Sequence, residues 1–177
     1  MCVTTATPRI ETRRLTLRAP QPQDAPRLAA LCNDFDIARM TSRMPWPYGL
    51  DDAEGYIARQ ALADHRMEAA FLIEHDDEGV VGSLGFHPAE SGPVEVGYWV
   101  GKPFWGRGIA SEALVGAMAW AGSEWKKRVV AAGHFSDNPA SGRVLCRAGF
   151  LYTGQVELRA SKARGEAAPL RSMIWLP

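Results

Sequence analysis

The 177-residue chain has few cysteines, no net charge and no long apolar run, and each shortage excludes a class of protein. Its three cysteines, Cys2, Cys32 and Cys146, are odd in number, widely separated and without Cys-x-x-Cys spacing. Such a set forms neither a disulfide framework nor a zinc knuckle. The histidines also lack the spacing of a metal site. We therefore expect free thiols and no bound metal.

The charge balance and the hydropathy exclude two further classes of partner. Twenty Lys and Arg residues balance twenty Asp and Glu residues, so no overall field recruits nucleic acid or an anionic membrane. The N-terminal segment has no signal-peptide core, and no stretch reaches membrane-spanning length. We expect a soluble cytoplasmic protein whose residues 1–177 form a single domain.

The order of the predicted elements indicates an α+β fold. Apolar or alternating runs between turn residues predict strands, and apolar residues at helical spacing predict helices. Strands are expected at 15–18, 69–74, 80–86, 94–100, 129–134, 150–157 and 170–175, and helices at 24–32, 51–66, 108–123 and 138–147. A meander followed by a strand-helix-strand unit predicts a mixed sheet with helices packed on it.

Residues 96–114 are the most informative segment of the chain. A strand-like run ends in a proline-containing turn, and Gly106 and Gly108 then open a helix. Glycine lacks a Cβ atom, so its backbone can curl tightly and ligand atoms can approach its N–H group. The first turn of a helix has unpaired N–H groups and the positive end of the helix dipole. Together these features predict a phosphate or diphosphate site.

Other uses of such glycines fit less well. A dinucleotide-binding fold needs a third glycine and a later acidic residue, and both are missing. A Walker loop needs a Gly-Lys-Ser/Thr sequence, which does not follow. A simple turn at the start of a helix remains the structural alternative.

Several motifs resemble those of the GCN5-related N-acetyltransferase (GNAT) superfamily, over nearly the whole chain. Residues 105–110, Trp-Gly-Arg-Gly-Ile-Ala, are similar to its acetyl-CoA signature, Gln/Arg-x-x-Gly-x-Gly/Ala, although Trp105 replaces the usual polar residue. Residues 138–141, Asn-Pro-Ala-Ser, followed by Gly149-Phe150, are similar to its second signature. Residues 11–18, 45–48 and 95–99 resemble the RimJ/RimL-like branch, which contains ribosomal-protein N-terminal acetyltransferases.

The resemblance implies a central, mostly antiparallel twisted sheet flanked by helices, with acetyl-CoA as co-substrate. It implies that main-chain amides of the glycine turn hold the diphosphate and that the end of the preceding strand pairs with the pantetheine arm. One N–H of that strand would polarise the thioester carbonyl; ordinary strand packing is the alternative. The implied cofactor-binding residues are Trp99, Val100, Trp105, Gly106, Arg107, Gly108, Ile109, Ala110, Ser111, Asn138 and Ser141, with the Arg107 side chain facing solvent.

Asn138 and Ser141 begin the last predicted helix. Asn138 suits the N-cap, with Pro139 at the first helical position, and the resemblance adds a hydrogen bond to pantetheine. Many relatives place a proton-donating tyrosine where this chain has Leu145, which cannot donate. The resemblance therefore implies that Ser141 protonates the departing thiolate. A local bond to the backbone is the alternative for a helix serine.

The attacking amine must lose a proton, and Glu95, at the start of the central strand, is the candidate base because a carboxylate could take that proton directly or through water. An exposed ion pair is the alternative. His87 follows a strand and could face the same cleft, and a surface position in a loop is its alternative. The resemblance also places loop residues in the acceptor pocket, and anchoring of that loop against the core is their alternative. The candidate acceptor-binding residues are Trp46, Tyr48, Phe86 and His87.

These expectations describe an acetyl-CoA-dependent N-acetyltransferase in which a primary amine attacks directly. No acyl-enzyme is expected, since Cys146 lies inside a helix, is expected to be buried and has no neighbouring histidine. The acceptor is a protein N-terminus or a small amine, and its identity depends on residues 40–50, 86–91 and 158–169. Residues 157–171 are expected to form a flexible loop or a contact surface, and a homodimer is left open. The alternative function is a non-catalytic acyl-CoA-binding or sensing module.

Overall fold

The computed structural model describes residues 7–89 and 92–177, so Cys2, Glu90 and Ser91 lie outside the described residues. The described strands form one sheet in the order β1-β2-β3-β4-β5-β6-β8-β7. Neighbouring strands are antiparallel except β5 and β6, which are parallel. The predicted α+β fold with a mostly antiparallel mixed sheet is confirmed.

Each predicted strand and helix is present, with shifted ends. The strands are β1 (Ile10–Glu11), β2 (Leu15–Arg18), β3 (Ala69–His75), β4 (Gly79–His87), β5 (Glu95–Val100), β6 (Val130–Phe135), β7 (Leu151–Ser161) and β8 (Glu166–Trp175). The helices are α1 (Ala25–Cys32), α2 (Phe35–Ala38), α3 (Leu50–Ala61), α4 (Ile109–Ser123) and α5 (Pro139–Arg147), with short 3₁₀ turns η1 (Pro22–Asp24) and η2 (Lys102–Phe104). The sequence pattern does not predict β1 or α2, and α3 ends at Ala61 rather than at residue 66.

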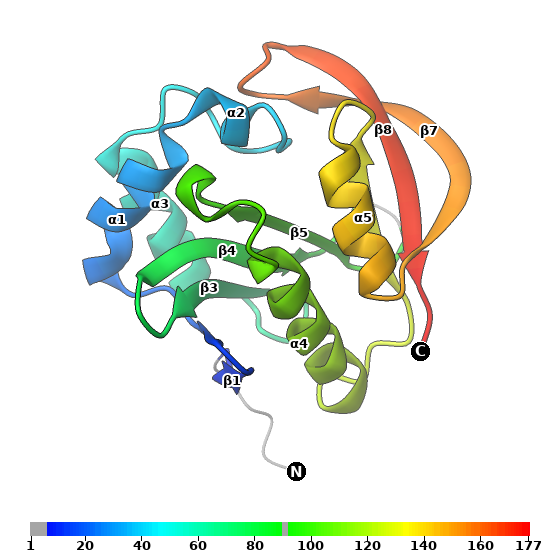
Figure 1. The fold of residues 1–177 in the computed structure, drawn as a ribbon, viewed down its shortest axis with the longest axis horizontal. Coiled ribbons are helices and arrows are strands. Elements are labelled where there is room, and N and C mark those ends of the chain that lie inside the picture. The colour runs from blue at the N-terminus through cyan, green and yellow to red at the C-terminus, as the bar shows by residue number, and fades with distance from the viewer. Residues whose placement is uncertain (1–6, 90–91) are drawn as a thin grey trace.

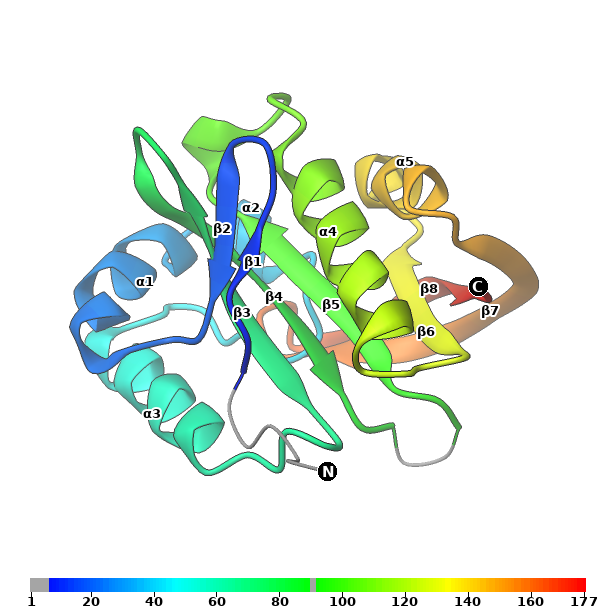
Figure 2. The same cartoon turned by 90° about the horizontal axis from the view of Figure 1, so that it is seen from below.

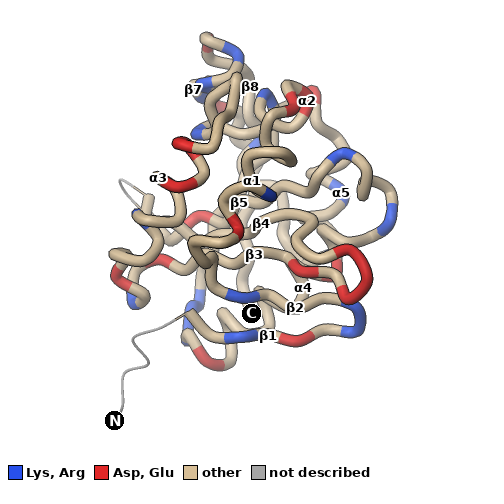
Figure 3. The backbone as a smooth tube through the Cα atoms, turned by 90° about the vertical axis from the view of Figure 1, so that its left-hand side faces the viewer, with Lys and Arg blue, Asp and Glu red and all other residues tan. Residues whose placement is uncertain are grey.

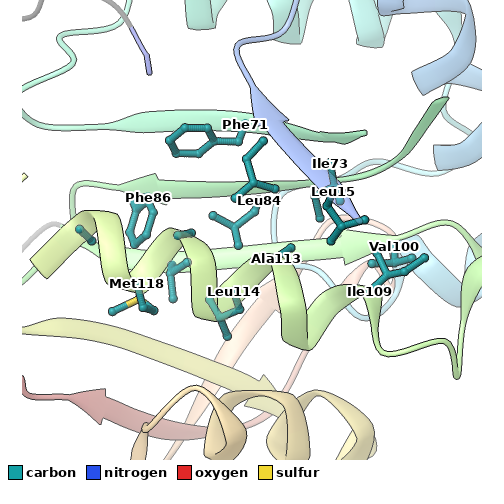
Figure 4. Close-up of a cluster of buried hydrophobic side chains, with 14 of the residues drawn as sticks. Leu15, Phe71, Ile73, Leu84, Phe86, Val100, Ile109, Ala113, Leu114 and Met118 are labelled. Carbon is teal, nitrogen blue, oxygen red and sulfur yellow. The ribbon is translucent and has the colours of Figure 1, made fainter. Parts of the chain in front are cut away.

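Helices cover both faces of the sheet. Helices α1 and α3 pack together on one face, where Leu28 and Ile57 meet Leu72 of β3. Helix α4 lies on the other face, and α5 lies beside α4 and β6 (Figure 2). Figure 4 shows Phe71, Leu84 and Phe86 of the sheet facing α4. Burial on both faces explains why β3 and β4 read as nearly continuous apolar runs.

The C-terminal strands correct one expectation. Residues 157–171 are not a loop, because β7 continues to Ser161 and β8 begins at Glu166. The two strands form a long curved hairpin at the side of the molecule (Figure 1). Strand β7 is the sheet edge, and its residues from Leu151 to Leu158 are exposed on both faces. Alternating burial is therefore missing from this strand. For this reason the sequence pattern does not predict that the strand continues to Ser161.

The charged residues are spread over the molecule rather than gathered on one side. Acidic and basic stretches occur together along the backbone in the view of Figure 3. Among the described residues, none of the helices combines the length and the apolar character needed to cross a membrane.

The sheet opens at its centre, and this opening positions the site. Strands β5 and β6 share a single register pair, Glu95 with Ala131, within the described residues. Beyond that pair β6 continues alongside β8 while β5 stays with β4. The C-terminal part of β5 therefore has a neighbouring strand on one side only.

Candidate active site

A cavity of about 1140 Å³ lies where β5 and β6 diverge. Its lining comes from the loop after α1, from α3, β4, β5, the glycine turn, β6 and α5. Most residues predicted to act together line it: Tyr48, His87, Glu95, Trp99, Val100, Trp105, Gly106, Gly108, Ile109, Ala110, Ser111, Asn138 and Ser141. Arg107, Trp46 and Phe86 do not.

The glycine turn has the backbone that its sequence predicts. Gly106 and Gly108 both have φ of +75°, and Gly108 is the N-cap of α4 in the left-handed conformation. Residues other than glycine adopt this left-handed region only at a cost in free energy. The turn and the first residues of α4 line the cavity, where the start of the helix and its dipole favour a negative group.

Hydrogen bonds from the β1–β2 hairpin hold this turn in place. Glu112 of α4 accepts hydrogen bonds from Thr12 Oγ1 and Arg14 N, both at 2.8 Å, and from Arg14 Nε at 2.9 Å. Arg14 Nη2 also donates to the Arg107 carbonyl at 3.1 Å. Burial alone would raise the pKa of Glu112, but the bonds from Thr12 and Arg14 outweigh it and hold that pKa below its usual range. Sequence reasoning misses Arg14, since nothing in the sequence relates residues so far apart.

Two side chains of the turn and first helical turn point in different directions. Arg107 lies outside the cavity, where its Nη1 contacts Glu78 Oε1 at 3.1 Å and its guanidinium lies 5.7 Å from the centre of the Phe104 ring. Ser111 lines the cavity, and its Oγ is buried without a hydrogen-bond partner among the described residues. An orphaned buried hydroxyl favours a polar ligand at this position.

The end of β5 presents backbone groups to the cavity. Gly101 N donates to Val81 O at 2.8 Å, and Ala131 N donates to Val94 O at 2.9 Å. Backbone groups alternate between the two sides of a strand, so those of Tyr98 and Val100 point away from β4. The Val100 carbonyl is taken by the Trp105 indole, whose Nε1 donates to it at 2.6 Å. Trp105 thus stabilises the strand end in place of the polar residue usual in the signature.

Ser141 is hydrogen bonded to a tyrosine that sequence reasoning does not identify. Tyr98 Oη lies 2.8 Å from Ser141 Oγ and donates to Ser141 O at 3.0 Å. Burial raises the pKa of Tyr98, although the bond with Ser141 acts in the opposite direction, so the phenol is protonated at neutral pH. Asn138 caps α5 as predicted, its Oδ1 accepting from Ser141 N at 3.2 Å.

Glu95 and His87, the two titratable candidates paired with each other in the sheet, have different surroundings. Glu95 is in an ion pair with Arg159 of β7, the structural alternative for this residue. The pKa of Arg159 is raised, since its bonds to Glu95 and Glu157 outweigh burial. His87 is mostly buried, which with nearby Arg43 lowers its pKa to about 4. Its imidazole is therefore neutral at neutral pH, and its Nδ1 lies 3.8 Å from Glu68 Oε2.

The structure separates the predicted acceptor residues. Tyr48 is buried in the wall of the cavity, with Met44 nearby in the lining. Trp46 is about half exposed and packs edge-on against Phe35, with ring centres 5.2 Å apart. Phe86 is fully buried in the core under α4. Alternation along β4 turns Phe86 away from the face that carries His87. Neither Phe86 nor Trp46 lines the cavity.

Neither of the two described cysteines lines the cavity. Cys32 is buried, which raises the pKa of its thiol to about 12. Cys146 is exposed on α5, so the expectation that it is buried is wrong, but it does not line the cavity.

One carboxylate next to α5 is paired with two arginines from distant parts of the chain. Asp137, which precedes the N-cap of α5, contacts Arg39 Nη1 at 3.2 Å and Arg164 Nη2 at 2.9 Å. Arg39 follows α2, and Arg164 lies in the turn between β7 and β8. The bond from Arg164 is the main cause of the lowered pKa of Asp137.

Comparison with known proteins gives a consistent result. Residues 14–151 match the family model described as acetyltransferase (GNAT) domain. The chain is 29% identical over 159 residues to the uncharacterized N-acetyltransferase YoaA of Bacillus subtilis, covering 83% of this chain and 85% of the relative. It is 27% identical over 158 residues to the [Ribosomal protein uS5]-alanine N-acetyltransferase of Escherichia coli, covering 82% and 79%.

Solved structures have the same fold. The ribosomal L7/L12 α-N-protein acetyltransferase RimL, in complex with coenzyme A, has a TM-score of 0.82 at 22% identity, covering 96% of this chain and 98% of that one. The microcin C7 self-immunity acetyltransferase MccE, in complex with acetyl-CoA and AMP, has a TM-score of 0.81 at 19% identity, covering 94% of each chain.

Proposed function

The chain belongs to the acetyltransferase (GNAT) domain family, and on that premise we propose that it transfers the acetyl group of acetyl-CoA to a primary amine. The observation that carries the proposal is the glycine turn at the start of α4, which opens into the same cavity as Ser141 and the free edge of β5. In this proposal residues 1–177 act as one acetyltransferase domain.

The residues around the turn fit the diphosphate of coenzyme A. The amides from Gly106 to Ala110 would hold its oxygens, and the unpartnered Ser111 hydroxyl would donate a further hydrogen bond. Arg14, whose charge is paired with Glu112, supports the turn through its bond to the Arg107 carbonyl. The pantetheine arm would run along β5, where the backbone groups of Tyr98 face the cavity, and the Tyr98 N–H suits the developing oxyanion.

The chemistry is a direct transfer. The amine nitrogen attacks the thioester carbon, a C–N bond forms, and the C–S bond breaks with its electron pair on sulfur. Ser141 would give its hydroxyl proton to that sulfur, and Tyr98 Oη, 2.8 Å away, would turn its own proton from the Ser141 carbonyl to the serine oxygen left behind. The Glu95 carboxylate, the base expected from the sequence, is already paired with Arg159 through Oε1.

We favour a protein N-terminus as the acceptor, with a small amine as the alternative. The relative from Escherichia coli is named for an alanine of ribosomal protein uS5, and RimL for ribosomal protein L7/L12. A cavity of about 1140 Å³ with lining on both sides of β5 has room for an extended peptide end.

A thiol-release assay with acetyl-CoA tests the function and the acceptor class together. Wild-type protein is assayed against peptides with free N-termini, the same peptides with blocked N-termini, and a panel of small amines. Release of coenzyme A with free but not blocked peptides supports the proposal. Tight acetyl-CoA binding by calorimetry with no thiol release from any amine would instead support a non-catalytic binding module. Absence of binding would refute both.

A further inference from the structure

We infer that the acceptor amine sits over Gly85 and Gly97 and that His87, positioned by Glu68, is the base that takes its proton. This inference rests on the proposed transfer reaction and assigns a base to it. His87, Glu68 and both glycines line the cavity, with Ser83 and Glu95 on the same strands.

The two glycines form a hollow in the floor of the cavity. Gly85 of β4 and Gly97 of β5 are directly paired in the sheet. A Cβ atom on Gly85 would lie 2.9 Å from His87 Nε2 and 3.1 Å from its Cε1, whereas one on Gly97 would meet nothing within 4 Å. The imidazole therefore lies over Gly85, and the space over Gly97 beside it is open. A small primary amine fits such a space next to a ring nitrogen.

The contacts of His87 leave the correct nitrogen for a base. Its Nδ1 faces Glu68 Oε2 at 3.8 Å, while Nε2 lies over the hollow. A proton on Nδ1, directed at the carboxylate, leaves the lone pair of Nε2 free to accept. The 3.8 Å separation is longer than a hydrogen bond, and such contacts commonly shorten when substrate binds.

The surroundings of His87 set its protonation state before attack. Burial and the Arg43 guanidinium hold the pKa of His87 at about 4, so the free base is present before attack. Burial and Arg43 both oppose the imidazolium that forms on attack, and the Glu68 carboxylate, 3.8 Å from Nδ1, is the group placed to stabilise it. Glu95, directly opposite His87 in the sheet, is already neutralised by Arg159.

The hollow and Ser141 lie on opposite sides of β5. Alternation along the strand directs Gly97 and Tyr98 to opposite faces, and the Tyr98 side chain reaches Ser141 of α5. The amine would attack from the Gly97 side while sulfur leaves toward Ser141. The amine proton goes to His87 Nε2, sulfur takes the Ser141 proton, and solvent returns the His87 proton to Ser141.

The test compares His87→Ala and His87→Gln with wild type, using an acceptor that wild type acetylates. Both variants should lose about 10²–10⁴-fold in kcat, with the Kd for acetyl-CoA unchanged. Added imidazole should restore part of the kcat of His87→Ala, and reactions without acceptor correct for acetylation of imidazole itself. His75→Ala is the matched control, since His75 is also buried on the sheet but its side chain accepts from Asp77 N and does not line the cavity. It should keep its kcat.

Three outcomes would overturn the assignment: an unchanged kcat in both variants, a loss that imidazole does not restore, or an equal loss in His75→Ala. Wild type that acetylates no acceptor would instead overturn the proposed function. Glu68→Gln tests the positioning role. It should lower kcat with the KM for acceptor unchanged, and it should have no further effect in the His87→Ala background. Full additivity of the two changes would refute coupling between Glu68 and His87.

Discussion

Replacing Gly108 with alanine should weaken acetyl-CoA binding about five- to thirtyfold. The reason is the backbone, because φ is +75° and the nearest atom to an added Cβ is Arg14 Nη2 at an ordinary 3.7 Å. Holding an alanine in the left-handed region costs about 1–2 kcal/mol. To relieve that strain, the turn would have to rotate its amides away from the cavity, which would weaken their bonds to the ligand. A loss of about 1.4 kcal/mol in binding free energy raises the Kd tenfold.

A substitution series separates backbone strain from bulk. Gly108→Asn should bind better than Gly108→Ala, since asparagine tolerates the left-handed region, and Gly108→Val should bind worst. Gly154 of β7 is the matched control, because its φ is +84°, nothing lies within 4 Å of an added Cβ, and it does not line the cavity. Gly154→Ala should lower Tm by roughly 2–4 °C per kcal/mol and leave acetyl-CoA affinity unchanged.

Calorimetric titration with acetyl-CoA and thermal unfolding without ligand measure the two effects separately. If Gly108→Ala kept the wild-type Kd and lost only as much Tm as Gly154→Ala, the left-handed turn would not be what binds the ligand. The same conclusion would follow if the asparagine and valine variants bound equally well.

Three further predictions concern neighbouring groups. Ser141→Ala should lower kcat about 10²-fold with acetyl-CoA Kd unchanged, and Tyr98→Phe about fivefold, the value of one neutral hydrogen bond; steady-state kinetics with wild-type values for either would contradict these roles. Glu112→Gln should lower the free energy of unfolding by about 1–2 kcal/mol and raise the acetyl-CoA Kd, measured by urea unfolding and calorimetry; an unchanged Kd would show that the hairpin does not support the turn. The pKa of Asp137 is lowered by Arg164, so its stabilisation is complete above the unfolded-state pKa and is lost as pH falls through the folded-state pKa. Asp137→Asn should therefore flatten the acid side of the stability curve, and a slope equal to wild type would contradict this.

The sequence predicts the elements whose signals are local. Gly106 and Gly108 specify the turn through their own conformational freedom, and Asn138 with Pro139 specifies the start of α5. The apolar runs of β3 and β4 locate the centre of the sheet because those strands are buried on both faces.

The parts that sequence does not predict depend on contacts between distant residues. Tyr98 and Ser141 are 43 residues apart, and Arg14 and Glu112 are 98 apart. Neither pair has a spacing that local periodicity can detect. Phe86 and His87 are adjacent, yet one is in the core and the other in the cavity, so one residue of strand register decides which belongs to the site.

The position of Asp137 has a thermodynamic consequence for the two substrates. Through Arg39 and Arg164 this single carboxylate links the end of α2 and the β7–β8 turn to the start of the helix that carries Ser141. If one substrate displaces either of these ion pairs when it binds, it changes the binding free energy of the other substrate. Linkage requires the two effects to be equal. We therefore expect the amine and the thioester to alter each other's affinity by the same factor, and the Asp137→Asn enzyme to bind them more independently.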